Sequence, residues 1–418
     1  MKIVLAAKSI YPFHPFGGVQ KYVYHFAKYL SREGIDIEII APLDQGKPRT
    51  EKFEGLTYTL LAPSIYKYLE YPIGWWGVHL FSRSLARHLQ KTHFDILHSF
   101  DMTGYQYLKV SPRRPVIAHV FTDNYLCNPI SLKSPLNIFS LFASRFEPIK
   151  QKKIMLSPFA SAKEKRHYWP QYYFKIKPMS FCLQQAERIF SEDKYSQADI
   201  NTLFKVDPSK NEILPVGADI EFIDQAIQES SLTRQEIGLD EQDIVLITVN
   251  RLAADKGVDK ILFALKELMR YNARIKLIII GRGYQEKQIY KIIDDNGLQQ
   301  HVRHFKDVEE KKLYKFYKIS DIYISAFSYP GSSLSSLEAI SCGLPLITTA
   351  QPWLVRPRQN GIILADNEPH RIIQAVKDLI ESGDLARQGT ISREIAEEYR
   401  WDKIARQAIQ RYKTLLAI

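Results

Sequence analysis

The sequence predicts an α/β protein with two doubly wound parallel sheets in series, each covered by helices. Short apolar runs alternate with amphipathic helical patterns along both halves of the chain. This alternation is typical of parallel sheets with helices on both faces. It is interrupted by a basic and aromatic stretch over 127–178 and by a polar, acidic stretch over 219–241. We interpret the first stretch as an insertion in the first domain and the second as a linker.

In the first half, apolar runs predict short strands, and an amphipathic helix follows the first of them. One strand alternates Ile35, Ile37 and Ile39 with acidic residues. The strands are expected over 2–6, 35–41, 95–98, 116–119, 186–191 and 213–217, and the helix over 20–31.

The second half repeats this pattern. Ligands of such sheets bind beyond the carboxyl ends of the strands, so we expect the functional residues in the loops that follow them. The strands are expected over 244–250, 275–280, 302–305 and 321–326, and a helix over 258–271.

The composition is that of an ordinary globular protein of 418 residues, with 45% hydrophobic and 25% charged residues. Cys127, Cys182 and Cys342 give neither a disulfide framework nor a zinc-site spacing, which favours a reducing compartment. The first apolar run stops at Lys8 and predicts a strand, not a signal peptide. No apolar run approaches the roughly 18 to 20 residues of a membrane span, so we expect a cytoplasmic protein.

The formal net charge of +11 favours anionic partners, such as phosphorylated substrates, a membrane surface or nucleic acid. Three interpretations of the insertion over 127–178 stay open. It forms an irregular covering layer with a solvated basic face, or it rests on the inner face of an anionic membrane, or it binds nucleic acid. The last ranks lowest, because no nucleic-acid-binding motif accompanies it.

The first chemical motif is Gly17-Gly18, between the first strand and its helix. Two glycines let a ligand approach the backbone, and the helix N-terminus that follows favours anions. A tight strand-to-helix turn explains the same pair equally well. The spacing is not that of a dinucleotide fingerprint.

The second motif, RLAADKG over 251–257, directly follows a predicted strand. Arg251 offers a planar fork and Lys256 a mobile point charge, which suits a diphosphate leaving group. The alternative is a solvated turn in which Arg251 pairs with Asp255.

The third motif spans 328–345, where a Gly-Ser-Ser turn follows a strand and opens a helix. This is again a phosphate-accepting helix end. Glu338 lies among apolar neighbours in that helix, and a carboxylate there needs partners such as ribose hydroxyls. The alternative is a partly exposed glutamate paired with a lysine or arginine.

Together these motifs resemble those of the family 4 retaining glycosyltransferases. The resemblance covers most of the chain and is strongest over 213–412. Besides FGGVQ at 16–20, it rests on FDILHS (94–99), ILPVGAD (213–219), VNRLAADKGVDKIL (249–262), IIIGRGY (278–284), the segment over 320–347 and YRW (399–401).

The resemblance implies the B-type glycosyltransferase fold, in which two Rossmann-like domains face a cleft. Residues 1–218 would bind the acceptor and 219–400 the nucleotide-sugar, while the helix over 401–418 would return to the first domain, with Trp401 bracing the cleft. The implied donor-binding residues are Gly17, Gly18, Arg251, Lys256, Gly331, Ser332, Ser333, Leu334 and Glu338. Arg251 and Lys256 would hold the departing diphosphate. Neither a cofactor nor a metal is expected.

Two positions depart from the family pattern. The family usually has a glutamate that contacts the donor sugar eight positions before Glu338, where this chain has Pro330. A histidine often follows the strand over 116–118, whereas this chain has His119 two positions early and Phe121 at the aligned place, with Asp123 nearby. His119 is therefore either a catalytic residue or a core histidine at a strand end.

The function these features predict is transfer of a hexose, with retention, from a nucleotide-sugar to a glycan or lipid-linked acceptor in cell-surface polysaccharide or glycolipid synthesis. Pro330 motivates one alternative, a catalytically silent nucleotide-sugar-binding partner subunit. An epimerase of the same fold would need further acid and base groups, which we do not identify in the sequence.

Overall fold

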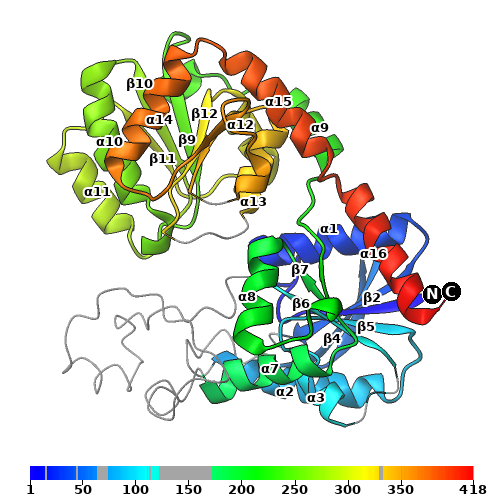
Figure 1. The fold of residues 1–418 in the computed structure, drawn as a ribbon. Helices are drawn as coiled ribbons and strands as arrows, with labels where there is room; N and C mark the ends of the chain where they lie inside the picture. Colours follow the sequence, from blue (N-terminus) through cyan, green and yellow to red (C-terminus); the bar gives the residue numbers. More distant parts are fainter. Residues whose placement is uncertain are drawn as a thin grey trace, which may run out of the picture. The chain divides into compact units, whose positions relative to one another are not determined.

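The computed structural model describes residues 1–14, 17–43, 46–63, 74–110, 112, 114–121, 172–328, 333–349 and 351–417. The chain forms two compact units, each built on its own sheet (Figure 1). Unit 1 comprises Met1–Val216 and Trp401–Ile418, and unit 2 comprises Gly217–Arg400. The predicted fold class, two doubly wound α/β domains, is confirmed.

The sheet of unit 1 has eight strands in the order β3-β4-β2-β1-β5-β6-β7-β8. Neighbouring strands are parallel except β3, which pairs antiparallel with β4 at the edge. The strands are β1 (Lys2–Ala6), β2 (Asp36–Leu43), β3 (Arg49–Phe53), β4 (Leu56–Pro63), β5 (Ile96–Phe100), β6 (Val116–Val120), β7 (Arg188–Ser191) and β8 (Asn211–Ile213).

The predicted strand over 213–217 is wrong in position, because β8 ends at Ile213. Pro215 has no backbone N–H and cannot continue the hydrogen-bonded ladder. The β3–β4 hairpin was not predicted. Its turn has positive φ at Glu54 and Gly55, which suits the tight turn between antiparallel strands.

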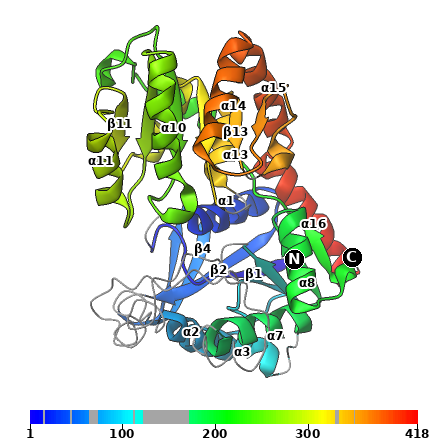
Figure 2. The ribbon, with the colours of Figure 1, turned by 60° about the vertical axis from the view of Figure 1, so that its left-hand side comes forward.

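Helices cover both faces of this sheet (Figure 2). On one face α1 packs against α16, and on the other α2, α3 and α7 form a contiguous layer. The helices of unit 1 are α1 (Gly18–Arg32), α2 (Gly74–Leu89), α3 (Tyr105–Lys109), the π-helical turn η2 (Tyr172–Ile176), α7 (Lys177–Gln185), α8 (Lys194–Phe204), the 3₁₀ turn η3 (Pro208–Lys210) and α16 (Trp401–Leu416). The predicted insertion over 127–178 lies mostly outside the described residues, and its last part forms η2 and the start of α7.

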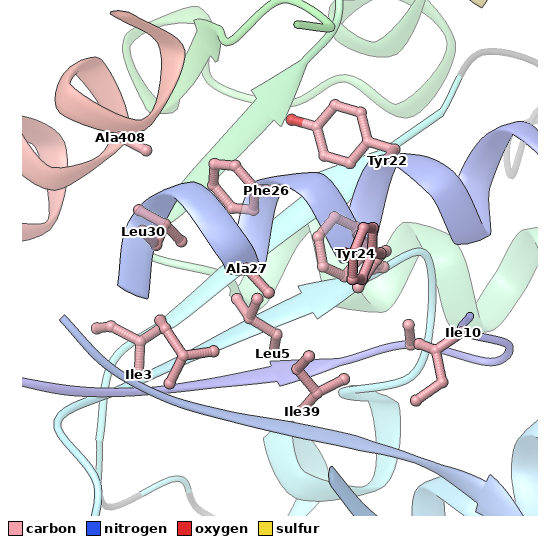
Figure 3. Close-up of a cluster of buried hydrophobic side chains, with 14 of the residues drawn as sticks. Ile3, Leu5, Ile10, Tyr22, Tyr24, Phe26, Ala27, Leu30, Ile39 and Ala408 are labelled. Carbon is pink, nitrogen blue, oxygen red and sulfur yellow. The ribbon is translucent and has the colours of Figure 1, made fainter. Parts of the chain in front are cut away.

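Helix α1 owes its position to an apolar stripe at helical spacing. Tyr22, Phe26 and Leu30 are four residues apart and lie on one face of the helix. This stripe belongs to a buried cluster that includes Ile3 of β1 and Ala408 of α16 (Figure 3). Burial of such side chains stabilises the unit by about 1.5–3 kcal/mol each.

A buried polar chain joins α16 to the sheet. The Tyr412 hydroxyl lies 2.6 Å from Nδ1 of His98 in β5, and Nε2 of His98 lies 3.0 Å from Nδ1 of His119 in β6. Both histidines are 0% exposed, and the ring of His119 stacks on Phe100 and Phe121. The pair is therefore a structural element of the core of unit 1.

The sheet of unit 2 has six parallel strands in the order β11-β10-β9-β12-β13-β14. They are β9 (Ile244–Val249), β10 (Ile275–Ile280), β11 (Val302–Phe305), β12 (Ile322–Ser325), β13 (Leu346–Thr348) and β14 (Gly361–Ile363). The helices are α9 (Ile220–Glu229), α10 (Val258–Tyr271), α11 (Glu286–Asp295), α12 (Glu310–Lys318), α13 (Leu334–Ser341), α14 (Pro369–Glu381) and α15 (Leu385–Glu397), with 3₁₀ turns η4 (Gln235–Ile237), η5 (Ala254–Lys256) and η6 (Pro352–Leu354).

The stretch over 219–241 is not the predicted linker, because it is folded into unit 2. Asp219 caps α9, whose Ile220 and Ile223 are buried. Arg234 then binds the Asp321 carboxylate through both oxygens and donates to the Ile319 carbonyl. The polar composition reflects these surface contacts. Among the helices of the described residues, none has the length and apolarity that crossing a membrane requires.

We expect acidification to destabilise unit 1 through its histidine pair. Burial lowers the pKa of His119 to about 3 and that of His98 well below its ordinary value of 6.5. The folded unit keeps both rings neutral, whereas the unfolded chain takes up protons below about pH 6.5. Their contribution is therefore complete above pH 6.5 and is lost as the pH falls toward 3, by up to ~1.4 kcal/mol per pH unit for each ring.

Hydrogen exchange of the β5 and β6 amides, corrected for the intrinsic exchange rate, measures this loss between neutral and mildly acidic pH. The variant His119→Phe removes one of the two rings and suits the aromatic surroundings of residue 119. It is expected to show a smaller pH dependence than the wild type, because about half of the contribution of the pair is removed, while that of His79, whose pKa burial also lowers, remains. Equal pH dependence in the two proteins would contradict the assignment.

Candidate functional site

The candidate site lies at the carboxyl edge of the unit 2 sheet, where the loops after β9 and β10 run side by side. Leu252 donates its N–H to the Arg282 carbonyl at 3.0 Å and accepts from the N–H of Gln285 at 3.1 Å. A Cβ at Gly283 would lie 2.2 Å from the Leu252 carbonyl oxygen, so this approach requires glycine. The two loops therefore form one ledge beyond the sheet.

Gly257 holds the first of these loops against β12. Its φ of +65° lies in the left-handed region, and a Cβ there would lie 1.9 Å from the Ala326 carbonyl oxygen. Ser328 also donates its N–H to the Asp255 carbonyl at 3.0 Å. The turn η5 is thus fixed to the end of β12, and α10 begins directly after it.

This turn carries both predicted cations. Lys256 is largely buried (16% exposed), with its Nζ 4.3 Å from the Phe327 ring centroid and 3.5 Å from Oδ2 of Asp255. Arg251 is 60% exposed and lies 4.0 Å from the same carboxylate. The Arg251–Asp255 pair of the alternative interpretation is therefore present, but an exposed pair at this distance contributes little. The guanidinium remains accessible to an anion.

Helix α13 begins at the same edge. The Ser333 hydroxyl accepts from the Ser336 N–H at 3.3 Å and lies 2.8 Å from the Ser335 hydroxyl, which in turn lies 2.8 Å from that of Tyr323. Leu334 is the first helical residue, and amides of a first turn have no partner within the helix. Such an end favours anions. Gly331, Ser332 and Pro330 lie outside the described residues.

Glu338 is 5% exposed and accepts a hydrogen bond at 3.2 Å from the Tyr317 hydroxyl. It is buried, which differs from the partly exposed glutamate of the alternative interpretation. Burial and the nearby Glu338 charge raise the pKa of Tyr317 well above its ordinary value, which keeps this donor protonated. The carboxylate is thus held at a fixed place on α13.

The other predicted residues lie in unit 1. Gly17 precedes α1 in an extended conformation, and a Cβ there would lie 2.7 Å from Oε1 of Gln20. Gly18 is the first helical residue, and a Cβ there would meet nothing within 4 Å. His119 is enclosed in the core, which favours the interpretation of a core histidine. Asp123 lies outside the described residues.

Sequence reasoning missed two residues at the carboxyl edge of unit 2. Tyr284, which follows the Gly281-Arg282-Gly283 turn, is 66% exposed, and its hydroxyl accepts the Ala254 N–H at 2.9 Å. It caps the turn that carries Lys256. Gln351 is buried, and its side chain donates a hydrogen bond to the Ser333 carbonyl, directly before α13. An aromatic residue directly after a glycine turn was the available signal for Tyr284, whereas Gln351 has no local signal.

Within the described ranges, no group of three or more His, Cys, Asp or Glu side chains is arranged to hold a metal ion. Metal independence itself stays a prediction.

Two doubly wound domains, one with a cationic turn and a helix N-terminus at the edge of its sheet, define the B-type glycosyltransferase fold. The family models agree with this. Residues 16–222 match the model for Glycosyltransferase Family 4, and residues 229–393 match the model for Glycosyl transferases group 1. The chain belongs to family 4 of the glycosyltransferases.

The relatives are about a fifth to a quarter identical to the chain over the aligned regions. An uncharacterized glycosyltransferase of Methanocaldococcus jannaschii is 23% identical over 54% of this chain. A D-inositol 3-phosphate glycosyltransferase of Segniliparus rotundus is 22% identical over 56% of it. The matched region spans 60% and 53% of those two proteins. An alpha-monoglucosyldiacylglycerol synthase of Acholeplasma laidlawii is 22% identical over 91% of this chain and 87% of its own length.

Solved structures match the whole fold. Sucrose-phosphate synthase from Thermosynechococcus elongatus superposes with a TM-score of 0.77 at 14% identity, covering 100% of this chain and 99% of that one. Anabaena HepE in complex with UDP-glucose gives a TM-score of 0.67 at 16% identity, with both chains covered completely. At these identities the likeness shows the fold alone.

We expect Tyr284→Phe to loosen the turn that carries Lys256. The variant removes the acceptor of the Ala254 N–H, a loss of about 1 kcal/mol for one hydrogen bond. Hydrogen exchange over 253–257 should become several-fold faster.

Tyr290→Phe is the matched control, because Tyr290, on α11, is also exposed, and its hydroxyl lies 2.9 Å from Nδ1 of His304. Unchanged exchange over 253–257 in Tyr284→Phe, or an equal effect in the control, would show that the Tyr284 hydroxyl does not hold the turn.

Proposed function

We propose that the chain is a retaining, metal-independent glycosyltransferase that transfers a hexose from a nucleotide-sugar to a glycan or lipid-linked acceptor. The observation that carries the proposal is that Arg251 and Lys256, after β9, and the N-terminus of α13, after β12, lie at the same edge of the sheet, where β9 and β12 are neighbours. Transfer of a sugar from a nucleotide-sugar releases a diphosphate whose negative charge grows as the bond breaks. Preorganised cations and helix dipoles stabilise developing charge of this kind.

Each part of the edge has a role in this proposal. Lys256 supplies a positive charge that is fixed on Phe327, whereas the sequence suggested a mobile one, and the exposed Arg251 supplies a planar fork for phosphate oxygens. The amides of Ser333 and Leu334 donate to the diphosphate. Glu338, oriented by Tyr317, accepts from the ribose hydroxyls. Because these groups are in place before the reaction, little reorganisation opposes departure of the diphosphate.

The names of similar proteins support a donor and an acceptor of this class. HepE was solved with UDP-glucose. The Acholeplasma relative is named as a synthase of a glucosylated diacylglycerol, and another relative, from Mycobacterium tuberculosis, as a GDP-mannose-dependent mannosyltransferase acting on a phosphatidylinositol monomannoside. We therefore place the acceptor among glycolipids or lipid-linked glycans, in cell-surface glycolipid or polysaccharide synthesis.

A lipid acceptor fits a peripheral place on an anionic membrane. The layer of α2, α3, η2 and α7 exposes Leu80, Val110 and Tyr173. Lys177 lies 5.8 Å from the Tyr173 ring, and Lys109 lies on α3 of the same layer. Exposed apolar side chains with lysines beside them suit an anionic lipid surface.

One alternative keeps donor binding without catalysis. Pro330 has no side-chain hydrogen-bonding group at the position where the resemblance expects a glutamate. A silent partner subunit would bind a nucleotide-sugar and release no product with any acceptor.

Thermal unfolding with UDP, GDP, ADP and TDP, in the presence of a chelator, tests the donor site. One nucleotide is expected to stabilise the wild type by about 2.7 kcal/mol at a concentration of 100 times its Kd. Arg251→Ala and Lys256→Ala should lose most of this stabilisation and lower transfer by about 10²–10³-fold, as loss of a charge-stabilising group does.

Arg270→Ala is the control, since Arg270 is equally exposed and paired with Glu267, at the end of α10. It should behave as the wild type does. Absence of any nucleotide effect in folded wild-type protein would refute the donor site.

We expect the full chain to sediment with vesicles containing phosphatidylglycerol, less so at high salt, since screening weakens the attraction. A double variant, Lys109→Glu with Lys177→Glu, should reduce sedimentation several-fold. The double variant Lys306→Glu with Lys377→Glu is the control with the same change in net charge, because these lysines lie over the Tyr290 and Tyr271 rings of unit 2 at 6.0 Å and 4.5 Å. Equal loss in both would assign binding to net charge alone, and no loss in either would exclude this layer.

A further inference from the structure

Gln351 lies at the same edge as the cationic turn, just after β13. The preceding strand end is tied to β12, because Thr349 donates its N–H to the Ser325 carbonyl at 3.2 Å and its hydroxyl to the Phe327 carbonyl at 2.8 Å. Phe327 is the residue that packs under Lys256. The place of Gln351 is therefore fixed relative to the proposed diphosphate site.

The backbone of Gln351 is in an unfavourable conformation. Its φ of 60° and ψ of 51° lie in the left-handed region, which residues other than glycine rarely adopt. Such a conformation costs of order 1 kcal/mol or more and persists where surrounding structure imposes it, often at functional sites. The side chain of this residue is buried, with Gln351 2% exposed.

The side-chain amide of Gln351 is only half satisfied. Its Nε2 donates to the Ser333 carbonyl at 3.3 Å, directly before α13. Because that carbonyl can only accept, the hydrogen bond fixes which end of the amide is nitrogen. Its Oε1 is buried and has no hydrogen-bond partner in the part of the chain that the structure describes. A buried acceptor without a donor costs about 1–3 kcal/mol.

Other buried glutamines share this deficiency but not this place. Oε1 of Gln285 and that of Gln388 also lack a hydrogen-bond partner among the described residues. Gln388 lies in α15, and its Nε2 donates to the Ser382 hydroxyl. Gln285 directly precedes α11, in the loop after β10, and its Nε2 donates to Oε1 of Gln288 at 3.5 Å. Only Gln351, of these three, contacts the residue that caps α13.

We propose that Oε1 of Gln351 accepts a hydrogen bond from a hydroxyl of the sugar that the nucleotide donor carries. This proposal rests on the proposed function. If the diphosphate lies at the N-terminus of α13, its sugar lies within a few ångströms of Ser333, beside Gln351. A carboxamide oxygen only accepts, so it selects a ligand that donates, as a pyranose hydroxyl does. The side chain thereby distinguishes a sugar-bearing nucleotide from the nucleotide alone.

The test compares dissociation constants for UDP and UDP-glucose, and for GDP and GDP-mannose, by calorimetry. Gln351→Met keeps the length and shape of the side chain and removes the amide. We expect it to bind the nucleotide diphosphate within about twofold of the wild type and to bind the matching nucleotide-sugar about tenfold more weakly, which corresponds to one hydrogen bond. Gln351→Gly relieves the left-handed backbone and should show the same loss for the sugar.

The remaining outcomes are each decisive. Unchanged affinity for both ligands in the two variants overturns the proposal. An equal loss for nucleotide and nucleotide-sugar also overturns it, because Gln351 then only positions α13. Wild-type protein that binds neither pair refutes the donor site itself, and with it the proposed function. Circular dichroism and the thermal unfolding transition show, independently of ligand affinity, that each variant is folded.

Discussion

The close approach of Gly257 to the carbonyl oxygen of Ala326 is the contact on which the candidate site depends. A Cβ at residue 257 would lie 1.9 Å from that oxygen, so any other residue would push the turn η5 away from β12. Lys256 would then leave the ring of Phe327, and the Asp255 carbonyl would lose the Ser328 N–H. Gly283, against Leu252, makes a second such contact. Backbone packing between neighbouring loops thus sets the position of the charges.

The two cations of this turn are held near one carboxylate, and one of them stays accessible to an anionic ligand. Asp255 lies between the two cations and partly offsets them, which limits their mutual repulsion. Lys256 is largely buried on an aromatic face, where a cation is stabilised by about 0.5–2 kcal/mol. Arg251 is exposed and only loosely paired, at 4.0 Å. An incoming diphosphate therefore binds Lys256 in its fixed place and the exposed Arg251. Only the exposed contact between Arg251 and Asp255 must break for this.

Local sequence patterns predicted the parts of the fold that local physics determines. Strand β10 and helix α10 have the expected bounds, because a continuous apolar run and a regular apolar stripe each have one structural solution. The three-residue strands β13 and β14 are too short to give a pattern. The cationic turn was predicted from its place after a strand. Apolar neighbours indicated burial of Glu338 and a strand end indicated burial of His119, but only as one of two interpretations, because the residues that enclose them are distant in sequence. The contacts of Gln351 also depend on distant residues, and no local signal shows them.

The position of His119 limits how the reaction can be catalysed. Its imidazole is enclosed by aromatic rings and bound to His98, and burial lowers its pKa to about 3, so it stays neutral near neutral pH. A buried ring bound to a second histidine has no route to exchange protons with a substrate. In the proposed mechanism the diphosphate departs without a protein acid, because its phosphate oxygens are already weak bases. Charges at the edge of unit 2 then stabilise the departing diphosphate, and recognition of the sugar is left to separate groups, among which we have proposed Gln351.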